Sequence, residues 1–252
     1  MEGRLIKADH EIQLRLLDLQ AIDIVVAQLQ HRRANLPEHG QLAKLDQERS
    51  AAAAALVEAE TQVSDLELAQ QQAETDLEPV RDRLRRNQQR VDDGSVADAK
   101  ALSGLVEEIQ HLGRRIGDLE DAELEVMEQL ETASKKRDEL AGGNAELEQQ
   151  VSQLTARRDE QLAGIDAELS DQQTRRDAVL TELPTDLIAG YDKIRATHGG
   201  VGAAELRARR CTGCQLEVNA ADLRAFAAAA ADEVLRCEEC GRILVRTVNS
   251  GL

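Results

Sequence analysis

The chain has almost no aromatic residues. Its 252 residues include one Tyr, one Phe and no Trp, together with only three Pro and four Cys. Large aromatic side chains normally contribute much of a globular core. Their scarcity excludes a broad core and leaves a narrow seam of Leu and Ala between helices. The abundance of Ala, Leu, Glu, Gln and Arg is also typical of coiled coils. The composition therefore predicts a mainly α protein.

Long apolar runs are also absent. No stretch approaches the ~20 apolar residues of a membrane span. The first residues, MEGRLIKADHEIQL, have no signal-peptide apolar region. We therefore expect a cytoplasmic protein with no membrane contact, either a monomer or a weak dimer.

The charge is strongly acidic and unevenly distributed. The formal net charge is −17, whereas residues 201–252 hold seven Arg and seven Asp or Glu. The imbalance therefore lies in the first 200 residues. A surface of this sign repels nucleic acid at long range, so any nucleic-acid binding requires a local basic patch.

Apolar residues recur every seven positions on both sides of the segment DDGSVAD, residues 92–98. The repeat before this segment contains Leu42, Leu56, Val63, Leu77, Leu84 and Val91, and the repeat after it contains Leu102, Ile109, Ile116, Leu130 and Val151. The segment holds Gly94, which can leave helical geometry, and the two arms are nearly equal in length. We expect an antiparallel coiled-coil hairpin. The competing arrangement is a parallel dimer of continuous helices, which Asn144 at a core position would favour.

Three sites interrupt the expected helices. Pro37 predicts a helix break followed by a new first turn. Pro79 lies inside the repeat, where it removes a backbone hydrogen bond and is expected to kink the helix. Gly142-Gly143 weaken the returning arm. Folding at Gly94 should pair residues whose numbers sum to about 187, which places these glycines near residues 44 and 45.

The four cysteines form two C-x-x-C pairs, Cys211/Cys214 and Cys237/Cys240, separated by 22 residues. Two such turns can present four thiolates to one metal ion, and this spacing is typical of a zinc site. A dithiol redox couple and a four-cysteine iron site are the alternatives. The βαβ unit expected of a thioredoxin-type redox site is not evident. We therefore predict one structural Zn²⁺ with no open coordination position.

The residues around the cysteines predict a small ribbon. LRARR and RILVRTV have the pattern of short strands, and Asn219 is placed to cap a helix between the two pairs. Tyr191 should pack where the stalk meets the ribbon, and Phe226 under the ribbon helix. The expected organisation is a coiled-coil hairpin stalk at 1–183 with its tip near 92–96, a junction helix and hinge at 184–200, and a C4 zinc ribbon at 201–252.

The segments RCTGCQLEVNAADLRAF and LRCEECGRILV resemble the bacterial family of C4-type zinc-ribbon proteins carried on a long coiled-coil hairpin. The resemblance extends to residues 100–131, which follow the tip, and to LPTDLIAGYDKIR at 183–195. It implies a non-enzymatic adaptor or regulatory protein in which the four cysteines bind zinc. Relatives in flagellated bacteria are linked to flagellar gene expression through an alternative sigma factor and messenger RNA.

Two functional hypotheses follow. The first is an adaptor that binds a protein partner, with the transcription or RNA machinery as the partner class. The second is direct binding of RNA or DNA through arginines of the ribbon and the stalk tip. The candidate contact residues are Arg207, Arg209, Arg210, Arg224, Arg242 and Arg246 in the ribbon, and Arg81, Arg83, Arg85, Arg86 and Arg90 in the stalk. No Ser/His/Asp set or phosphate-binding loop is present, so we expect no enzyme activity.

Overall fold

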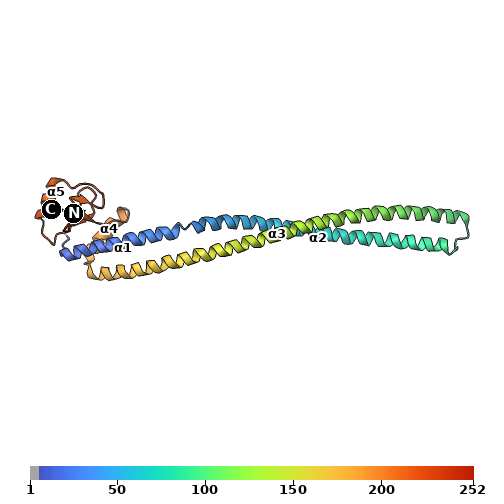
Figure 1. Ribbon diagram of the computed structural model, residues 1–252, viewed down its shortest axis with the longest axis horizontal. Helices are drawn as coiled ribbons and strands as arrows, with labels where there is room; N and C mark the ends of the chain where they lie inside the picture. The colour runs from blue at the N-terminus through green and yellow to red at the C-terminus, as the bar shows by residue number, and fades with distance from the viewer. Residues whose placement is uncertain (1–5) are drawn as a thin grey trace. The chain divides into compact units, whose positions relative to one another are not determined.

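The structure is a computed structural model that describes residues 6–252. Residues 1–5 of the expected stalk lie outside the described part. The helices are α1 (His10–Ala34), α2 (Pro37–Asp92), α3 (Ala99–Glu182), α4 (Thr185–Thr197) and α5 (Ala220–Ala228), and the strands are β1 (Ala203–Arg207), β2 (Arg210–Cys211), β3 (Leu235–Arg236) and β4 (Ile243–Val245) (Figure 1). The contacts divide the chain into two compact units, residues 1–39 with 156–252, and residues 40–155.

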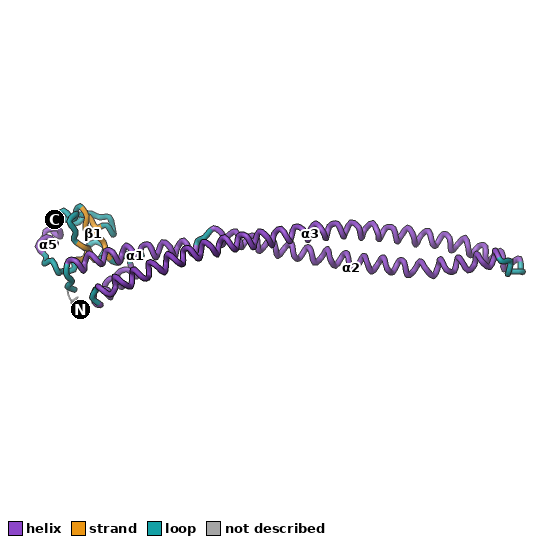
Figure 2. Tube along the Cα trace, turned by 60° about the horizontal axis from the view of Figure 1, so that its bottom comes forward, coloured by secondary structure: helices purple, strands orange, loops and turns teal. Residues whose placement is uncertain are grey.

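In the unit of residues 40–155, α2 and α3 lie side by side and antiparallel (Figure 2). The seam buries Val63 and Leu77 of α2 and Leu105 and Leu112 of α3, as the seven-residue repeat predicts. Gly94 has a φ of 64° where α2 ends, and the Asp98 carboxylate accepts a hydrogen bond from the backbone NH of Ala101 at the start of α3. The mainly α hairpin fold is therefore confirmed.

The two arms of the hairpin pair in a different register from the one that the sequence predicted. Arg81 contacts Glu120 and Arg83 contacts Glu108, so partner numbers sum to 201 and 191, above the expected value near 187. The cause lies at the tip, because α2 ends at Asp92 and α3 begins only at Ala99. Gly142-Gly143 therefore lie opposite residues closer to the tip than 44 and 45. Helix α2 continues through Pro79.

In the other unit, α1 packs beside the end of α3 and beside α4. Helix α1 ends at Ala34 and α2 begins at Pro37, which confirms the predicted break there. Leu29, Leu36 and Ile165 form a small core around this break. A larger core joins α1 and α4 to the ribbon, and Tyr191 is fully buried within it, as predicted.

The ribbon is a four-stranded sheet with the order β2-β1-β4-β3. The pairs β1–β2 and β3–β4 are antiparallel, whereas β1 and β4 run parallel with Ala204 opposite Leu244. Asn219 caps α5 by accepting hydrogen bonds from the backbone NH groups of Ala221 and Asp222. Phe226 of α5 is buried in the ribbon core, as predicted.

Two chain segments complete the edges of the ribbon. Near the N-terminus, Lys7 forms a β-bridge with Glu233, and the backbone NH of Ala8 donates to the Asp232 carbonyl. At the other end, the NH groups of Ala208 and Arg209 donate to carbonyls of residues 249 and 250. Residues near both ends of the chain therefore bond to the ribbon backbone, one segment beside β3 and the other at the turn between β1 and β2. Within residues 6–252, no helix is both long enough and apolar enough to cross a membrane.

Candidate metal centre and its surroundings

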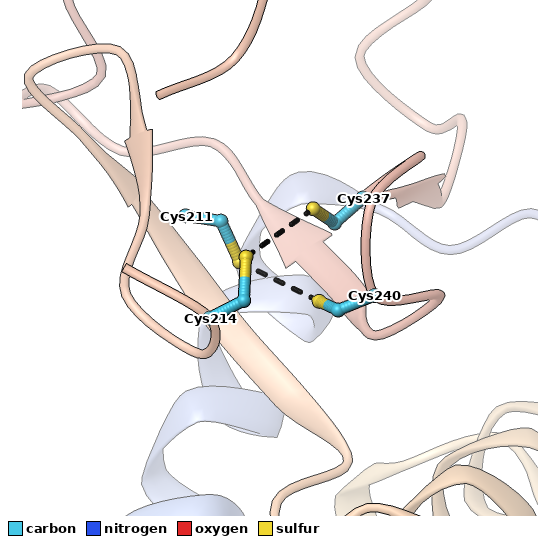
Figure 3. A group of neighbouring side chains, drawn as sticks. All are labelled: Cys211, Cys214, Cys237 and Cys240. Atoms are coloured by element: carbon cyan, nitrogen blue, oxygen red, sulfur yellow. Dashed lines mark hydrogen bonds between the residues drawn. The ribbon is translucent and has the colours of Figure 1, made fainter. Parts of the chain in front are cut away.

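The four cysteine side chains point toward one another from two loops of the ribbon (Figure 3). Their Sγ atoms all lie within 4.8 Å of one another. The Sγ–Sγ distance is 3.9 Å for Cys211 and Cys240 and also for Cys214 and Cys237. A regular tetrahedron with Zn–S bonds of ~2.3 Å has edges of about 3.8 Å. The donor set therefore fits a tetrahedral zinc ion.

The local backbone explains how each C-x-x-C pair turns. The NH of Gln215 donates to the carbonyl of Cys211, and the NH of Gly241 donates to the carbonyl of Cys237. Gln215 and Gly241 both have positive φ, at 66° and 68°. Gly241 adopts this conformation without strain because it lacks a Cβ, whereas Gln215 does not have that freedom. Each loop thus closes on itself and presents two sulfur atoms on one side.

The thiols differ in acidity. Burial raises the pKa of the Cys237 thiol to about 12. Burial also acts to raise the pKa of Cys240, but hydrogen bonds from Arg242, Cys237 and Cys214 together outweigh it and lower the pKa of this thiol to about 7. A bound zinc ion deprotonates its thiol ligands, and four thiolates with Zn²⁺ carry a formal charge of −2. Arg242 is therefore positioned to offset part of that charge.

Comparison with known proteins identifies the hairpin and the ribbon separately. Residues 19–199 match the family described as CT398-like coiled coil hairpin domain. This match spans more than half of the chain. The chain belongs to the CT398-like coiled-coil hairpin family. Residues 210–244 also match the C4-type zinc ribbon domain, which confirms the prediction of one structural zinc. Neither CT398-like hairpins nor C4-type ribbons are known enzyme families.

Relatives of similar length support this assignment. An uncharacterized protein of Mycobacterium tuberculosis is 32% identical over 240 residues, covering 95% of this chain and 97% of the relative. A solved structure from Mycobacterium smegmatis has a TM-score of 0.82 and 33% identity, covering 96% of this chain and 100% of the other. CT398 from Chlamydia trachomatis shares the fold at 17% identity and a TM-score of 0.67, covering 94% of this chain and 98% of its own.

In this CT398-like chain, two predicted contact arginines support the ribbon from within. The Arg242 guanidinium donates to the carbonyls of His198 and Val201, at 3.0 Å each. Arg246 donates to the carbonyls of Phe226, Ala229 and Ala230, which end α5. Both side chains are partly buried, and their donors are already bonded to backbone.

The other ribbon arginines are exposed. Arg207 pairs with Glu205 at 2.6 Å, and Arg209 donates to the carbonyl of Gly251. Arg210 and Arg224 have no ion pair within the described chain. The turn between β1 and β2 holds Ala208 and Arg209 at φ of 47° and 64°, a conformation that residues with a Cβ adopt at some cost. The structure therefore gathers Arg207, Arg209 and Arg210 on one hairpin turn.

The stalk arginines mostly have acidic neighbours. Arg81 and Arg83 contact Glu120 and Glu108 on the opposite arm, and Arg85 contacts Asp82 on its own helix. Arg86 and Arg90 are exposed and have no ion pair among the described residues. Their role as partner contacts stays a prediction.

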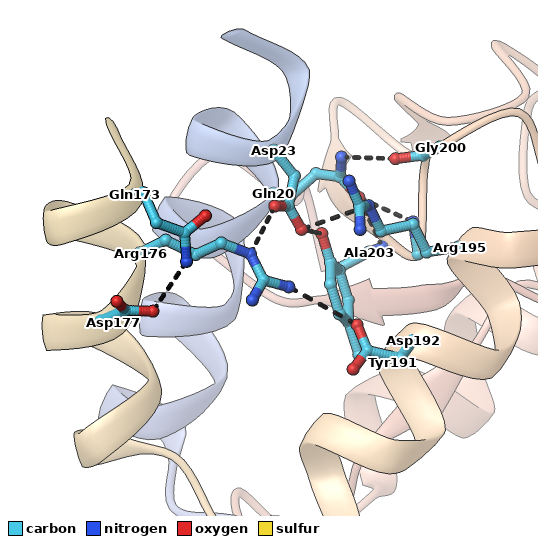
Figure 4. A network of polar contacts seen from close by, with 11 residues as sticks. Gln20, Asp23, Gln173, Arg176, Asp177, Tyr191, Asp192, Arg195, Gly200 and Ala203 are labelled. Carbon is cyan, nitrogen blue, oxygen red and sulfur yellow. Dashed lines mark hydrogen bonds and ion pairs between the residues drawn. The ribbon is translucent and has the colours of Figure 1, made fainter. Parts of the chain in front are cut away.

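A buried polar network that the sequence analysis missed lies between α1, α3 and α4 (Figure 4). Asp23 is only 1% exposed, and its carboxylate accepts hydrogen bonds from Arg176 Nε and from Tyr191 OH, each at 2.7 Å. Arg195 Nε lies 3.2 Å from the same carboxylate. Burial and the neighbouring carboxylate raise the pKa of Tyr191 well above its usual value. Asp23 therefore joins three helical segments.

Two glutamines of α1 extend this polar face to the ribbon. The Gln20 side chain donates to the carbonyl of Gly200 and accepts from the backbone NH groups of Gly202 and Ala203. Gln13 donates to carbonyls of the N-terminal segment and of residues 231 and 233. The available sequence signal was an acidic residue, Asp23, inside the apolar run AIDIVVA.

Proposed function

We propose that the protein is a non-enzymatic adaptor that binds a protein partner, with the transcription or RNA machinery as the partner class. The observation that carries this proposal is the closed metal centre. Four thiolates occupy all four coordination positions of a tetrahedral zinc ion. The metal can therefore stabilise the ribbon, but it has no free coordination position for water or substrate. Among the described residues, these four cysteines are the one group of His, Cys, Asp or Glu side chains that lie close enough together to bind a metal ion.

The way the ribbon is attached supports the same role. The N-terminal segment pairs with the ribbon at Lys7 and Glu233, and Gln20 bonds to the chain that enters β1. These contacts hold the ribbon on α1 as part of one compact unit. A folded head fixed on helices presents a defined surface, which is what an adaptor needs and a flexible tethered module lacks.

The test is a crosslinked pull-down with the full chain as bait, carried out with and without nuclease. The adaptor function predicts a partner protein that remains bound after nuclease treatment. A control chain with Cys237→Ser and Cys240→Ser should lose partners that contact the ribbon. Recovery of nucleic acid alone, with every protein lost on nuclease treatment, would contradict the proposal.

A second candidate function is direct nucleic-acid binding, supported by the exposed turn that carries Arg207, Arg209 and Arg210. Lys and Arg contacts to phosphates give an affinity that falls steeply with salt. The measurement is a salt titration of RNA and DNA binding by the full chain. Arg210→Gln should reduce the affinity and the salt slope, with Arg175→Gln on α3 as the matched control. Absence of binding at low salt would exclude this candidate.

A further inference from the structure

The acidic charge of the chain is concentrated in one part of the coiled coil. We call residues 50–80 of α2 together with residues 116–134 of α3 the acidic band. It holds fourteen Asp and Glu and no Lys or Arg, which accounts for most of the net charge of −17. The two segments lie against each other, since Gln70 lines a groove with Leu124 and Met127. Within the described chain, only Glu120 and Glu131 of the band have an ion pair, to Arg81 and Lys135.

Large apolar side chains are exposed inside this band. Leu124 is 57% exposed and Met127 is 44% exposed. They lie together on α3 and line a groove of about 360 Å³ with Gln70, Leu130 and two glutamates, Glu128 and Glu131. Exposed apolar residues that are adjacent and ringed by charge are typical of an interaction site. Scattered single residues would need no such explanation.

The same face of α3 continues toward the tip with small and apolar residues, interrupted by Glu120, which pairs with Arg81. Leu102, Val106, Gly113, Gly117 and Leu124 are spaced by four and seven residues, which returns to one face of a helix. Leu102 and Val106 are 37% and 40% exposed. A Cβ added at Gly113 or Gly117 would meet no atom within 4 Å, so this face is open. A second helix can therefore approach this face closely at Gly113 and Gly117.

The negative charge of the acidic band indicates which kind of partner can bind this face of α3. A second copy of the chain would bring fourteen further acidic groups against the same surface, which repulsion disfavours. A helix with apolar anchors flanked by Lys and Arg matches both the groove and the field around it. We propose that the face of α3 at Leu124 and Met127 docks a basic amphipathic helix of a partner protein. This inference rests on the proposed adaptor function and names the chemistry of its partner.

The first test uses the full chain and a synthetic probe of known chemistry. The probe is a helical peptide of roughly 18 residues with Leu on one face and Lys on the other, and its control is a scrambled peptide of the same composition. Fluorescence anisotropy should show tighter binding of the amphipathic helix. Leu124→Gln with Met127→Gln should weaken this binding by about tenfold or more, because each buried apolar side chain contributes on that scale. Leu68→Gln, on an exposed residue of α2 outside the groove, should leave it unchanged.

Charge is tested with a matched pair of variants. Glu128→Gln with Glu131→Gln should weaken the peptide and reduce its salt dependence. Glu146→Gln with Glu148→Gln, the same change on exposed residues of α3 outside the band, should have little effect. Circular dichroism of each variant checks that the helices are retained. Equal binding of the two peptides, or normal binding by the Leu124/Met127 variant, would overturn the proposal.

Two further outcomes distinguish a failure of the docking proposal from a failure of the adaptor function on which it rests. If the partner recovered in the pull-down binds the Leu124/Met127 variant as well as the unaltered chain, the docking face is wrong and the adaptor function stands. If the unaltered chain recovers no partner protein, the adaptor function itself fails. A dimer in sedimentation that the Leu124/Met127 variant abolishes would assign the face to a second copy and also overturn the proposal.

Discussion

Replacing Asp23 with Ala should destabilise the unit that contains α1, α4 and the ribbon. The substitution removes the carboxylate that accepts hydrogen bonds from Arg176 and Tyr191 and forms an ion pair with Arg195. Removing one partner of a buried ion pair typically costs 3–5 kcal/mol. The side chains of Arg176 and Arg195 remain 18% and 30% exposed, so water can partly replace the carboxylate. We therefore expect a loss of about 3 kcal/mol, at the lower end of that range.

The assay follows from the composition. Tyr191 is the single tyrosine of a chain without Trp, so intrinsic tyrosine fluorescence during urea unfolding reports directly on this network. Asp192→Ala is the matched control, because Asp192 is exposed and lies 3.7 Å from Arg176. An exposed pair of this kind contributes about 0–1 kcal/mol. The reasoning fails if both substitutions shift the unfolding free energy equally, because the burial of Asp23 would then have no energetic consequence.

Three further outcomes are expected. Elemental analysis should find one zinc per chain, and Cys237→Ser should abolish it while the far-ultraviolet dichroism of the long helices persists. Because the raised pKa of Tyr191 favours the folded state in its protonated form, the contribution of Tyr191 to stability should be constant below the ordinary tyrosine pKa of about 10 and fall as the pH rises above it. Tyr191→Phe should remove this loss of stability at high pH, and an unchanged slope would contradict the assignment. Gly202→Ala should lower the melting temperature, since the new Cβ would lie 2.7 Å from Tyr191 atoms, and a normal melting curve would show that the site can relax.

The hairpin and the ribbon were predictable because their signals are local. The seam that buries Val63, Leu77, Leu105 and Leu112 follows directly from a seven-residue repeat. The metal centre follows from the spacing of four cysteines, which fixes both the number of ligands and the type of site. These features depend on residues close in sequence or on a pattern that repeats, so a single sequence is enough.

The unit that contains α1, α4 and the ribbon was less predictable, because elements that are distant in sequence meet there. The sequence analysis placed residues 10–34 in the coiled-coil stalk and predicted no buried polar residue there, whereas the structure buries Gln13, Gln20 and Asp23 of α1. Buried polar side chains generally need hydrogen-bond partners, and the partners of Gln13 and Asp23 include residues 153 to 218 positions away. The roles of Arg242 and Arg246 were hidden for the same reason, since their acceptors are backbone carbonyls that no sequence pattern marks.

The polar face of α1 adds hydrogen bonds to the apolar core that joins α1 and α4 to the ribbon. Gln20 accepts from the backbone NH groups of Gly202 and Ala203, and Gln13 donates to the carbonyl of Glu233 beside β3. Both contacts use backbone groups of the ribbon, so they require its strands to be in position but not any particular side chain. A zinc ion bound by the four cysteines would fix the positions of the loops next to β2, β3 and β4. The metal would therefore stabilise the contacts of α1 as well as the ribbon, since a disordered ribbon would remove the backbone partners of Gln20 and the Glu233 carbonyl that Gln13 contacts.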